Sequence, residues 1–154
     1  MRQGITVQRA TGTELLVPGL LIVLGEVYGQ RGQPAEGLTT IAEALVLVHK
    51  TGECRDEAEL YRVKGALLLQ QSSDRQAEAE HCFHQAMAIA QEQQAKSWEL
   101  RAAISLARLW QQQGKRQEAH DLLAPVYNWF TEGFDTADLQ DAKALLDVLG
   151  EERL

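Results

Sequence analysis

The residue types best suited to metal binding or nucleophilic chemistry occur together in the run His81-Cys82-Phe83-His84. In a helix, His81 and His84 share one face because they are three positions apart, and imidazole nitrogen is a common zinc ligand. Two ligands do not make a zinc site, and Glu78, Glu80 and Cys54 do not lie at an obvious ligand spacing. The sequence therefore predicts exposed histidines beside a half-buried cysteine, and a metal protein or enzyme built around His81, Cys82 and His84 is the less favoured alternative.

Catalytic chemistry of other kinds finds no support in the sequence. Ser72 and Ser73 fall in a predicted turn, without the strand-turn-helix frame that activates a nucleophilic serine. No phosphate-binding loop of the G-x-x-x-x-G-K type occurs. We therefore expect a protein that is not an enzyme and that needs no cofactor.

The composition of the 154 residues indicates a folded, all-helical chain. Hydrophobic residues make up 45% of it and charged residues 24%, which suffices for a core. Three prolines and a single asparagine leave few turn residues for a many-stranded fold. The helix-favouring residues Ala, Leu, Glu and Gln dominate instead.

Charge and cysteine content narrow the environment in which the protein works. A formal charge of −7 disfavours nonspecific binding to nucleic acid or to an anionic membrane. Two cysteines are too few for a disulfide framework and fit the reducing cytoplasm. The apolar residues 15–25 are interrupted by Pro18 and Gly19 and are too few to span a bilayer. We expect a cytoplasmic protein that binds neither membrane nor nucleic acid.

Small and bulky residues recur along the chain in a fixed order, which indicates internal repeats. The three copies contain Gly25, Tyr28, Gly32, Gly37, Ile41 and Ala44; Gly65, Leu68, Ala79, Phe83 and Ala86; and Ala107, Trp110, Gly114, Ala119, Leu123 and Val126. The period is 40 to 42 residues if the second copy has two extra residues in the turn near residues 71–74. Two helices approach closely where Gly or Ala faces a bulky side chain, so each copy is predicted to be a helical hairpin.

The ends of the predicted helices carry their own signals. Gly32 and Gly114 are placed to end the first helix of a hairpin, and Asp74 is expected to cap the helix that carries Phe83. Pro125 is expected to interrupt the second helix of the third copy. A last helix is predicted over residues 137–149, with a cap at Asp135-Thr136 and an apolar stripe of Leu139, Ala142, Leu145, Leu146 and Leu149.

The pattern resembles the tetratricopeptide repeat (TPR), whose helix pair shows Leu-Gly-x-x-Tyr, a turn glycine, then Ala, an aromatic or aliphatic residue and Ala-Leu. The first copy matches best through Leu24, Gly25, Tyr28, Gly32, Ile41, Ala44 and Leu45, and it departs at Gly37, where Ala is usual. The resemblance implies an all-α, right-handed superhelix of antiparallel helix pairs, a TPR-like α-solenoid with about three repeats and a C-terminal capping helix. It implies one domain over residues 1–154, with a remnant half-repeat at 1–12, repeats at 18–52, 57–95 and 96–131, and the capping helix at 136–149.

A narrower resemblance covers the last third of the chain. The residues that carry it are Lys96-Ser97-Trp98-Glu99-Leu100, Leu106-Ala107-Arg108-Leu109-Trp110, Leu122-Leu123-Ala124-Pro125-Val126-Tyr127, Trp129-Phe130-Thr131-Glu132-Gly133-Phe134 and Ala142-Lys143-Ala144-Leu145-Leu146. They are similar to the C-terminal TPR region of bacterial signalling regulators that combine an AAA-type ATPase with a class III adenylate or guanylate cyclase domain or a DNA-binding domain. This implies, as an alternative, a regulatory or coupling segment that acts on upstream domains of a larger protein.

In a TPR superhelix the first helix of each pair lines a concave groove, so the resemblance also implies which residues meet a partner. The predicted groove residues are Ile22, Glu26 and Gln30, then Arg62 and Ala66, then Arg101, Ile104, Arg108 and Gln112. Since guanidinium groups match carboxylates, the three arginines favour an acidic segment or a peptide's terminal carboxylate as the ligand. The alternative is that they pair with Glu59, Glu99 and other neighbours on a solvated helix face.

These observations predict a non-catalytic protein–protein interaction scaffold that binds a protein or peptide in its groove or through its N-terminal face. Gly4, Val7 and Thr11-Gly12 align with Ala44, Leu47 and Thr51-Gly52 at a shift of 40, as the end of a missing repeat does. Lacking a capping helix, that face is expected to pair with a second copy, giving a homodimer, or with a neighbouring domain.

The aromatic residues allow two interpretations, a stacking platform for a ligand or ordinary packing. Trp110 stands where Tyr28 stands one repeat earlier, so it is predicted to lie in the core. Trp129, Phe130 and Phe134 are predicted to wedge the last hairpin against the capping helix.

Overall fold

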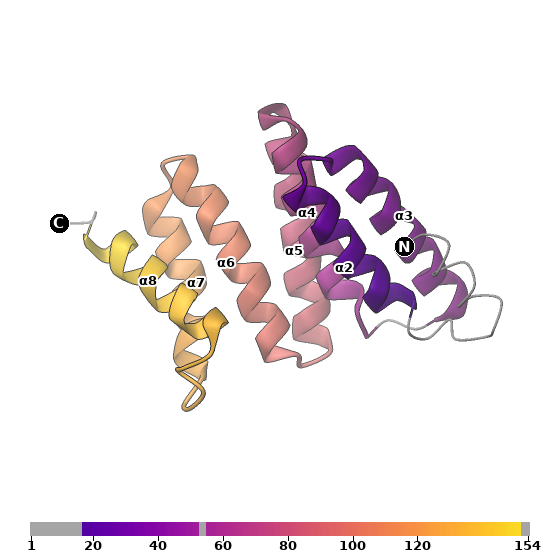
Figure 1. The fold of residues 1–154 in the computed structure, drawn as a ribbon. Helices are drawn as coiled ribbons and strands as arrows, with labels where there is room; N and C mark the ends of the chain where they lie inside the picture. Colours follow the sequence, from indigo (N-terminus) through magenta and orange to yellow (C-terminus); the bar gives the residue numbers. More distant parts are fainter. Residues whose placement is uncertain (1–16, 53–54, 152–154) are drawn as a thin grey trace. The chain divides into compact units, whose positions relative to one another are not determined.

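The computed structural model describes residues 17–52 and 55–151, and in these residues the fold is entirely helical (Figure 1). This part of the chain forms α2 (Val17–Gln30), α3 (Pro34–Thr51), α4 (Glu57–Gln71), the 3₁₀ turn η2 (Ser73–Arg75), α5 (Gln76–Glu92), α6 (Lys96–Gln112), α7 (Arg116–Trp129) and α8 (Ala137–Glu151). The prediction of an all-α fold is confirmed for the described ranges. The half-repeat expected at residues 1–12 lies outside them.

The recurring small and bulky residues take the same places in successive helices. The fourth and eighth residues are Gly37 and Ile41 in α3, Ala79 and Phe83 in α5, and Ala119 and Leu123 in α7, and all six are buried. In α2, α4 and α6, buried Gly25, Gly65 and Ala107 lie five or six residues before the end of the helix. The repeat pattern therefore corresponds to a repeated helix register.

The helices divide into two compact units, and the boundary falls inside α5, between Ala79 and Glu80. The first unit contains α2, α3, α4 and η2, and the second contains most of α5 with α6, α7 and α8.

In the first unit, α2 and α3 form a hairpin that depends on facing glycines (Figure 1). A Cβ atom added to Gly25 would lie only 2.8 Å from Cδ1 of Ile41. One added to Gly37 would lie 3.1 Å from the carbonyl oxygen of Gly25. Both separations are shorter than ordinary van der Waals contact, so any larger residue forces a neighbour to move. The turn between the helices uses Gly32 at a φ of +74°, as predicted.

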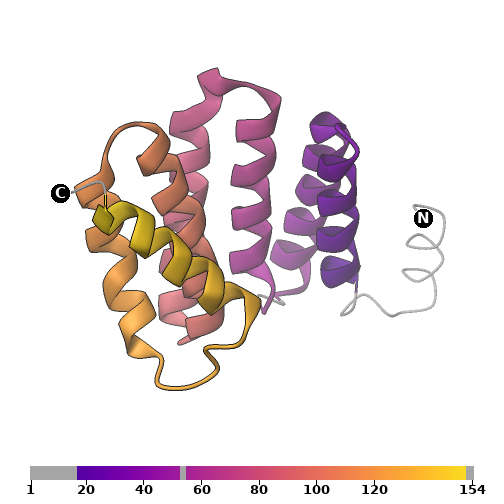
Figure 2. The ribbon, with the colours of Figure 1, turned by 60° about the vertical axis from the view of Figure 1, so that its left-hand side comes forward.

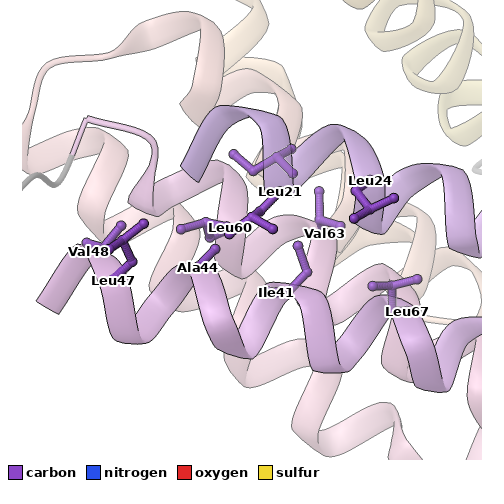
Figure 3. Close-up of a cluster of buried hydrophobic side chains, with 10 residues drawn as sticks. Leu21, Leu24, Ile41, Ala44, Leu47, Val48, Leu60, Val63 and Leu67 are labelled. Atoms are coloured by element: carbon purple, nitrogen blue, oxygen red, sulfur yellow. The ribbon is translucent and has the colours of Figure 1, made fainter. Parts of the chain in front are cut away.

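The third helix of this unit, α4, packs on the hairpin through Leu67. Its two methyl groups lie 3.0 Å from the Cβ positions of Gly29 in α2 and Gly37 in α3. Figure 3 shows the core that results, with Leu21, Leu24, Ile41, Ala44, Leu47, Val48, Leu60, Val63 and Leu67 gathered from the three helices. Glycine notches in α2 and α3 thus determine where α4 sits.

In the second unit, α8 lies against both α6 and α7 (Figure 2). Four residues of its predicted apolar stripe are buried: Leu139, Ala142, Leu145 and Leu149. The backbone N–H of Leu139 points to Oγ1 of Thr136 at 3.4 Å, and the N–H of Gln140 donates to the Thr136 carbonyl at 3.0 Å. The predicted last helix and its Thr136 cap are therefore confirmed.

Two local predictions were wrong. Pro125 does not interrupt the second helix of the third copy, because α7 continues through it to Trp129. Pro125 and Asp121, whose carbonyl loses its helical partner, are both exposed, so water can bond that carbonyl. Asp74, predicted to cap the helix that carries Phe83, lies inside η2, which the extra residues of the second copy form, and η2 is capped by Ser72, whose Oγ accepts from the N–H of Asp74 at 3.2 Å.

The glycine contact predicts a measurable coupling between Gly25 and Ile41. Gly25→Ala should cost up to about 2 kcal/mol, because overpacking of about 1 to 3 kcal/mol is offset by a gain in helix propensity of about 1 kcal/mol. Ile41→Val removes Cδ1, the closest atom, at a cost of about 1 kcal/mol. The loss in the free energy of unfolding of the double variant should be smaller than the sum of the two single losses by at least about 0.5 kcal/mol.

Urea denaturation of the four proteins measures this coupling. Gly150→Ala in α8 serves as the matched control, because a Cβ there meets nothing within 4 Å. That substitution should stabilise the fold by about 0.5 kcal/mol. If the losses in the free energy of unfolding at positions 25 and 41 are additive, the close contact between Gly25 and Ile41 is contradicted.

Candidate binding site

A cleft of about 270 Å³ lies between α2 and α4 in the first unit, and we call it the α2–α4 cleft. Its lining residues are Glu26, Gly29, Gln30, Arg62, Val63, Ala66, Leu67 and Gln70. Val63 and Leu67 are buried and form an apolar floor. Four residues predicted from the sequence to line a groove, Glu26, Gln30, Arg62 and Ala66, are therefore brought together here.

The cleft owes its shape to helical spacing. Arg62, Ala66 and Gln70 are four positions apart on α4, and Glu26 and Gln30 are four apart on α2, so two rows of polar side chains border the floor. Small residues, Gly29 and Ala66, leave the space between the rows open. Nε2 of Gln70 donates to the Gly29 carbonyl at 2.7 Å, which ties the two helices together at one end.

Arg62 is held in place by Glu59. Its Nε donates to Oε1 of Glu59 at 2.8 Å and its Nη2 donates to Oε2 at 3.1 Å, a bidentate pair with side chains only 14% and 7% exposed. The predicted alternative is confirmed in its partner, Glu59, but it was wrong about the surroundings, because the pair is nearly buried and does not lie on a solvated helix face. The guanidinium therefore enters the cleft wall with a fixed orientation and with its charge offset.

The groove residues predicted on α6 lie in the second unit, and two of them face the last helix. Nε of Arg101 lies 3.7 Å from Oδ2 of Asp138, and Nη2 of Arg108 lies 3.9 Å from Oδ2 of Asp141, both on α8. Gln112 is exposed, whereas Ile104 is buried. Both arginines thus help to seat α8, in addition to any role toward a partner.

Burial decides the role of the two predicted isoleucines. Ile22 and Ile104 are 7% and 5% exposed, and Ile22 belongs to the core cluster of the first unit. Both offer little surface to a ligand and support the helices from inside. The predicted pairing of an arginine with Glu99 was also wrong, since Glu99 contacts Lys96 and Gln91 instead.

A second, larger cleft of about 630 Å³ in the second unit was missed by sequence reasoning. Its lining residues are Gln91, Gln94, Lys96, Ser97, Trp129 and Phe130, and we call it the Trp129 cleft. Trp129 is 57% exposed, so the prediction that it wedges against the capping helix was wrong. Its partners are Phe130, at 5.2 Å between ring centroids, and the ammonium of Lys96, at 5.3 Å from the ring centroid. Phe134 does contact Tyr127, at 5.8 Å between centroids, but is itself 45% exposed.

The histidine run does not converge on a common point. His81 and His84 are exposed on α5, whereas Cys82 is buried. His84 lies beside Trp110, at 5.9 Å between ring centroids, and Nε1 of Trp110 donates to Oε1 of Glu80 at 3.0 Å. Trp110 is thus half-buried with a polar partner, where the sequence predicted simple core packing. Within the described ranges, no three His, Cys, Asp or Glu residues are placed to hold a metal ion.

Comparisons with known proteins do not assign this chain to a family. No protein-family model matches the chain, and no curated protein is significantly similar to it. Among the described residues, no helix combines the length and the apolar character needed to cross a membrane.

The exposure of His81 predicts that this residue contributes little to the fold. His81→Ala should change the free energy of unfolding by less than about 0.5 kcal/mol. Phe83→Ala, two positions away and 1% exposed in the native state, should cost about 3 to 5 kcal/mol. Thermal melts of the two variants beside the parent check both values, and a large loss for His81→Ala contradicts its surface placement.

Proposed function

We propose that this chain is a non-catalytic, TPR-like interaction scaffold that binds an extended segment of a partner protein in the α2–α4 cleft. The observation that carries the proposal is the cleft itself, which joins polar rows from two helices around a floor of small and apolar residues. Peptide-binding grooves have this combination, because the floor accepts side chains while the rim bonds the peptide backbone.

The repeated helix register supports the TPR-like part of the proposal. Three first helices carry a buried Gly or Ala near their ends, and three second helices carry a small and a bulky buried residue at positions four and eight. A right-handed superhelix of three helix pairs with a capping helix is the architecture proposed for this register. In such arrays the surface of the first helices, which includes the α2–α4 cleft, receives the partner.

The chemistry of the rim indicates what the partner segment offers. Gln30 and Glu26 on α2 face Gln70 and Arg62 on α4, so the rim supplies both donors and acceptors to an extended backbone. Arg62 is already bonded to Glu59, and a carboxylate of the partner therefore shares the guanidinium with Glu59. An acidic side chain or terminal carboxylate near Arg62 is the proposed anchor, and the Glu26 carboxylate on the opposite rim accepts a hydrogen bond from a donor of the segment.

Selection of peptides tests this proposal. A displayed library of random peptides is enriched on the purified protein, and the dissociation constant of the best synthetic peptide is measured by calorimetry. Ala66→Leu fills the cleft at an exposed helical position and should weaken binding at least tenfold, an expected loss of about 1.4 kcal/mol or more. Arg62→Glu should weaken the binding of peptides that contain Asp or Glu more than the binding of neutral peptides.

Ala42→Leu on α3 is the matched control, because Ala42 is exposed in the same unit but does not line the cleft. It should leave the dissociation constant unchanged. Enriched peptides that bind the Ala66→Leu variant as tightly as the parent protein refute this site, as does failure of the library to enrich.

We further propose that exposed aliphatic side chains of the first unit contact a second copy of the chain or a neighbouring domain. Leu20 and Val23 are 41% and 54% exposed on α2, and Val46 on α3 is 67% exposed. Exposed aliphatic side chains of this kind are typical of interfaces. In a larger bacterial signalling protein of the cytoplasm, the same surface suits an upstream ATPase or cyclase domain, and the chain then acts as a coupling segment.

Self-association by this surface is tested by sedimentation over a dilution series. The parent protein should dissociate from dimer to monomer on dilution, and the double variant Leu20→Glu, Val23→Glu should be monomeric throughout, because burying two carboxylates is costly. Val148→Glu, at a residue of α8 that is 41% exposed, controls for added charge. A parent protein that is monomeric at every concentration contradicts the homodimer.

A further inference from the structure

The Trp129 cleft contains an aromatic pair in which Trp129 is exposed and Phe130 is half-buried. Trp129 is the last residue of α7, and Phe130 follows in an extended conformation with φ −76° and ψ 137°. The two rings meet edge to face, with an angle of 86° between their planes, and both line the cleft. Leaving a large ring 57% exposed sacrifices apolar burial, so its position indicates use by a ligand.

The indole ring is held in place before any ligand arrives. The ammonium of Lys96 lies 5.3 Å from the ring centroid, and the same atom lies 3.2 Å from Oε1 of Glu99. Glu99 is 5% exposed, and its Oε2 accepts a hydrogen bond from Nε2 of Gln91 at 3.1 Å. A chain of contacts thus runs from a buried carboxylate to the exposed ring, and pre-organisation of this kind lowers the cost of binding.

The same contacts determine the charge of the occupant. Lys96 is the only charged residue that lines the cleft among the described residues, and Glu99 beside it offsets its charge. A cationic ligand competes with Lys96 for the indole face, and an anionic ligand gains little because Lys96 is already paired with Glu99. A neutral ligand with hydrogen-bonding groups is the complementary one.

The backbone at Gln94 adds an independent observation. Gln94 has a φ of +57°, and within the described ranges it is the one residue other than glycine with a positive φ. The matching connection one repeat earlier, 42 positions before, uses Gly52 at a φ of +74°. A backbone with positive φ is less favourable for glutamine than for glycine. The side chain of Gln94 lines the cleft.

We propose that the Trp129 cleft binds a proline-containing, extended segment of a partner protein. A proline ring packs on Trp129 in the notch formed with Phe130, as proline-rich segments do in aromatic-lined grooves. A polyproline II segment has no internal hydrogen bonds, so its carbonyl groups accept from the exposed amide of Gln94 and the exposed hydroxyl of Ser97. Such a segment is neutral and already extended, and a cleft of about 630 Å³ is within the usual range of about 300 to 1,000 Å³ for ligand sites.

This site is separate from the α2–α4 cleft and does not rest on the function proposed for it. The two have no lining residue in common and belong to different units. Variants at Ala66 and Trp129 therefore distinguish failure of one proposal from failure of the other.

The test uses fluorescein-labelled decaproline as the probe and a labelled glycine–serine decapeptide as its control, with binding to the full chain followed by fluorescence anisotropy. Decaproline should bind saturably and the glycine–serine peptide should not. Trp129→Ala should weaken decaproline binding at least about tenfold, as expected for loss of an aromatic anchor. Val148→Ala, which removes an exposed apolar side chain of the same unit outside the cleft, should not change it.

Gln94→Gly separates binding from stability. The substitution removes the backbone strain of a glutamine at positive φ, so the melting temperature should stay level or rise. Decaproline binding should weaken about fivefold, because the side-chain amide is lost. The proposal is overturned if decaproline does not bind at millimolar concentration, if Trp129→Ala binds it like the parent, or if Gln94→Gly leaves its affinity unchanged. Preferential binding of a labelled oligoarginine or oligonucleotide also overturns it.

Discussion

The close approach of α2 and α3 at Gly25 and Gly37 is the contact on which the first unit depends. With no side chain on either residue, Ile41 fits under α2 and Leu67 of α4 fits between Gly37 and Gly29. The position of α4 therefore follows from glycines that belong to the other two helices. The α2–α4 cleft follows in turn, because its rows of side chains face each other only when Leu67 is seated in this notch. A function proposed for the surface is thus derived from a packing constraint beneath it.

Much of this arrangement was predictable from the sequence because packing of small against bulky residues leaves a periodic trace. The registers of Gly37 with Ile41, Ala79 with Phe83 and Ala119 with Leu123 were recognised by spacing alone, and they coincide with helix positions four and eight. The cap at Thr136 and the turn at Gly32 were equally readable, since each depends on one residue and its immediate neighbours. Local rules and strict periodicity predict well where the tertiary structure agrees with both.

The predictions that failed concern residues whose role depends on what lies across from them. Pro125 is tolerated in α7 because its face is open to water, and no signal along the chain reveals that face. Trp129 was expected in a packed wedge because tryptophan usually buries its ring, yet α7 ends at this residue and the ring turns toward Lys96. The groove role predicted for the two arginines of α6 stays a prediction, but nothing in the sequence indicated that carboxylates of α8 approach both of them. Contacts between side chains of different helices depend on the tertiary structure, so they cannot be predicted from the spacing of residues in a single sequence.

Both clefts use the same device, a buried glutamate in the first turn of a helix that orients a basic residue three positions away. Glu59 holds Arg62 beside the α2–α4 cleft, and Glu99 holds Lys96 beside the Trp129 cleft. A carboxylate is favoured near a helix N-terminus, and this offsets part of the cost of burying it. Each pair offsets the charge of a basic residue while fixing it in one orientation, so recognition at either site is expected to depend on shape and short-range contacts, including the carboxylate contact proposed for Arg62, more than on long-range attraction. Gln94 has a left-handed backbone that is less favourable for glutamine than for glycine, and it lines the cleft at which its amide is proposed to bind the partner segment.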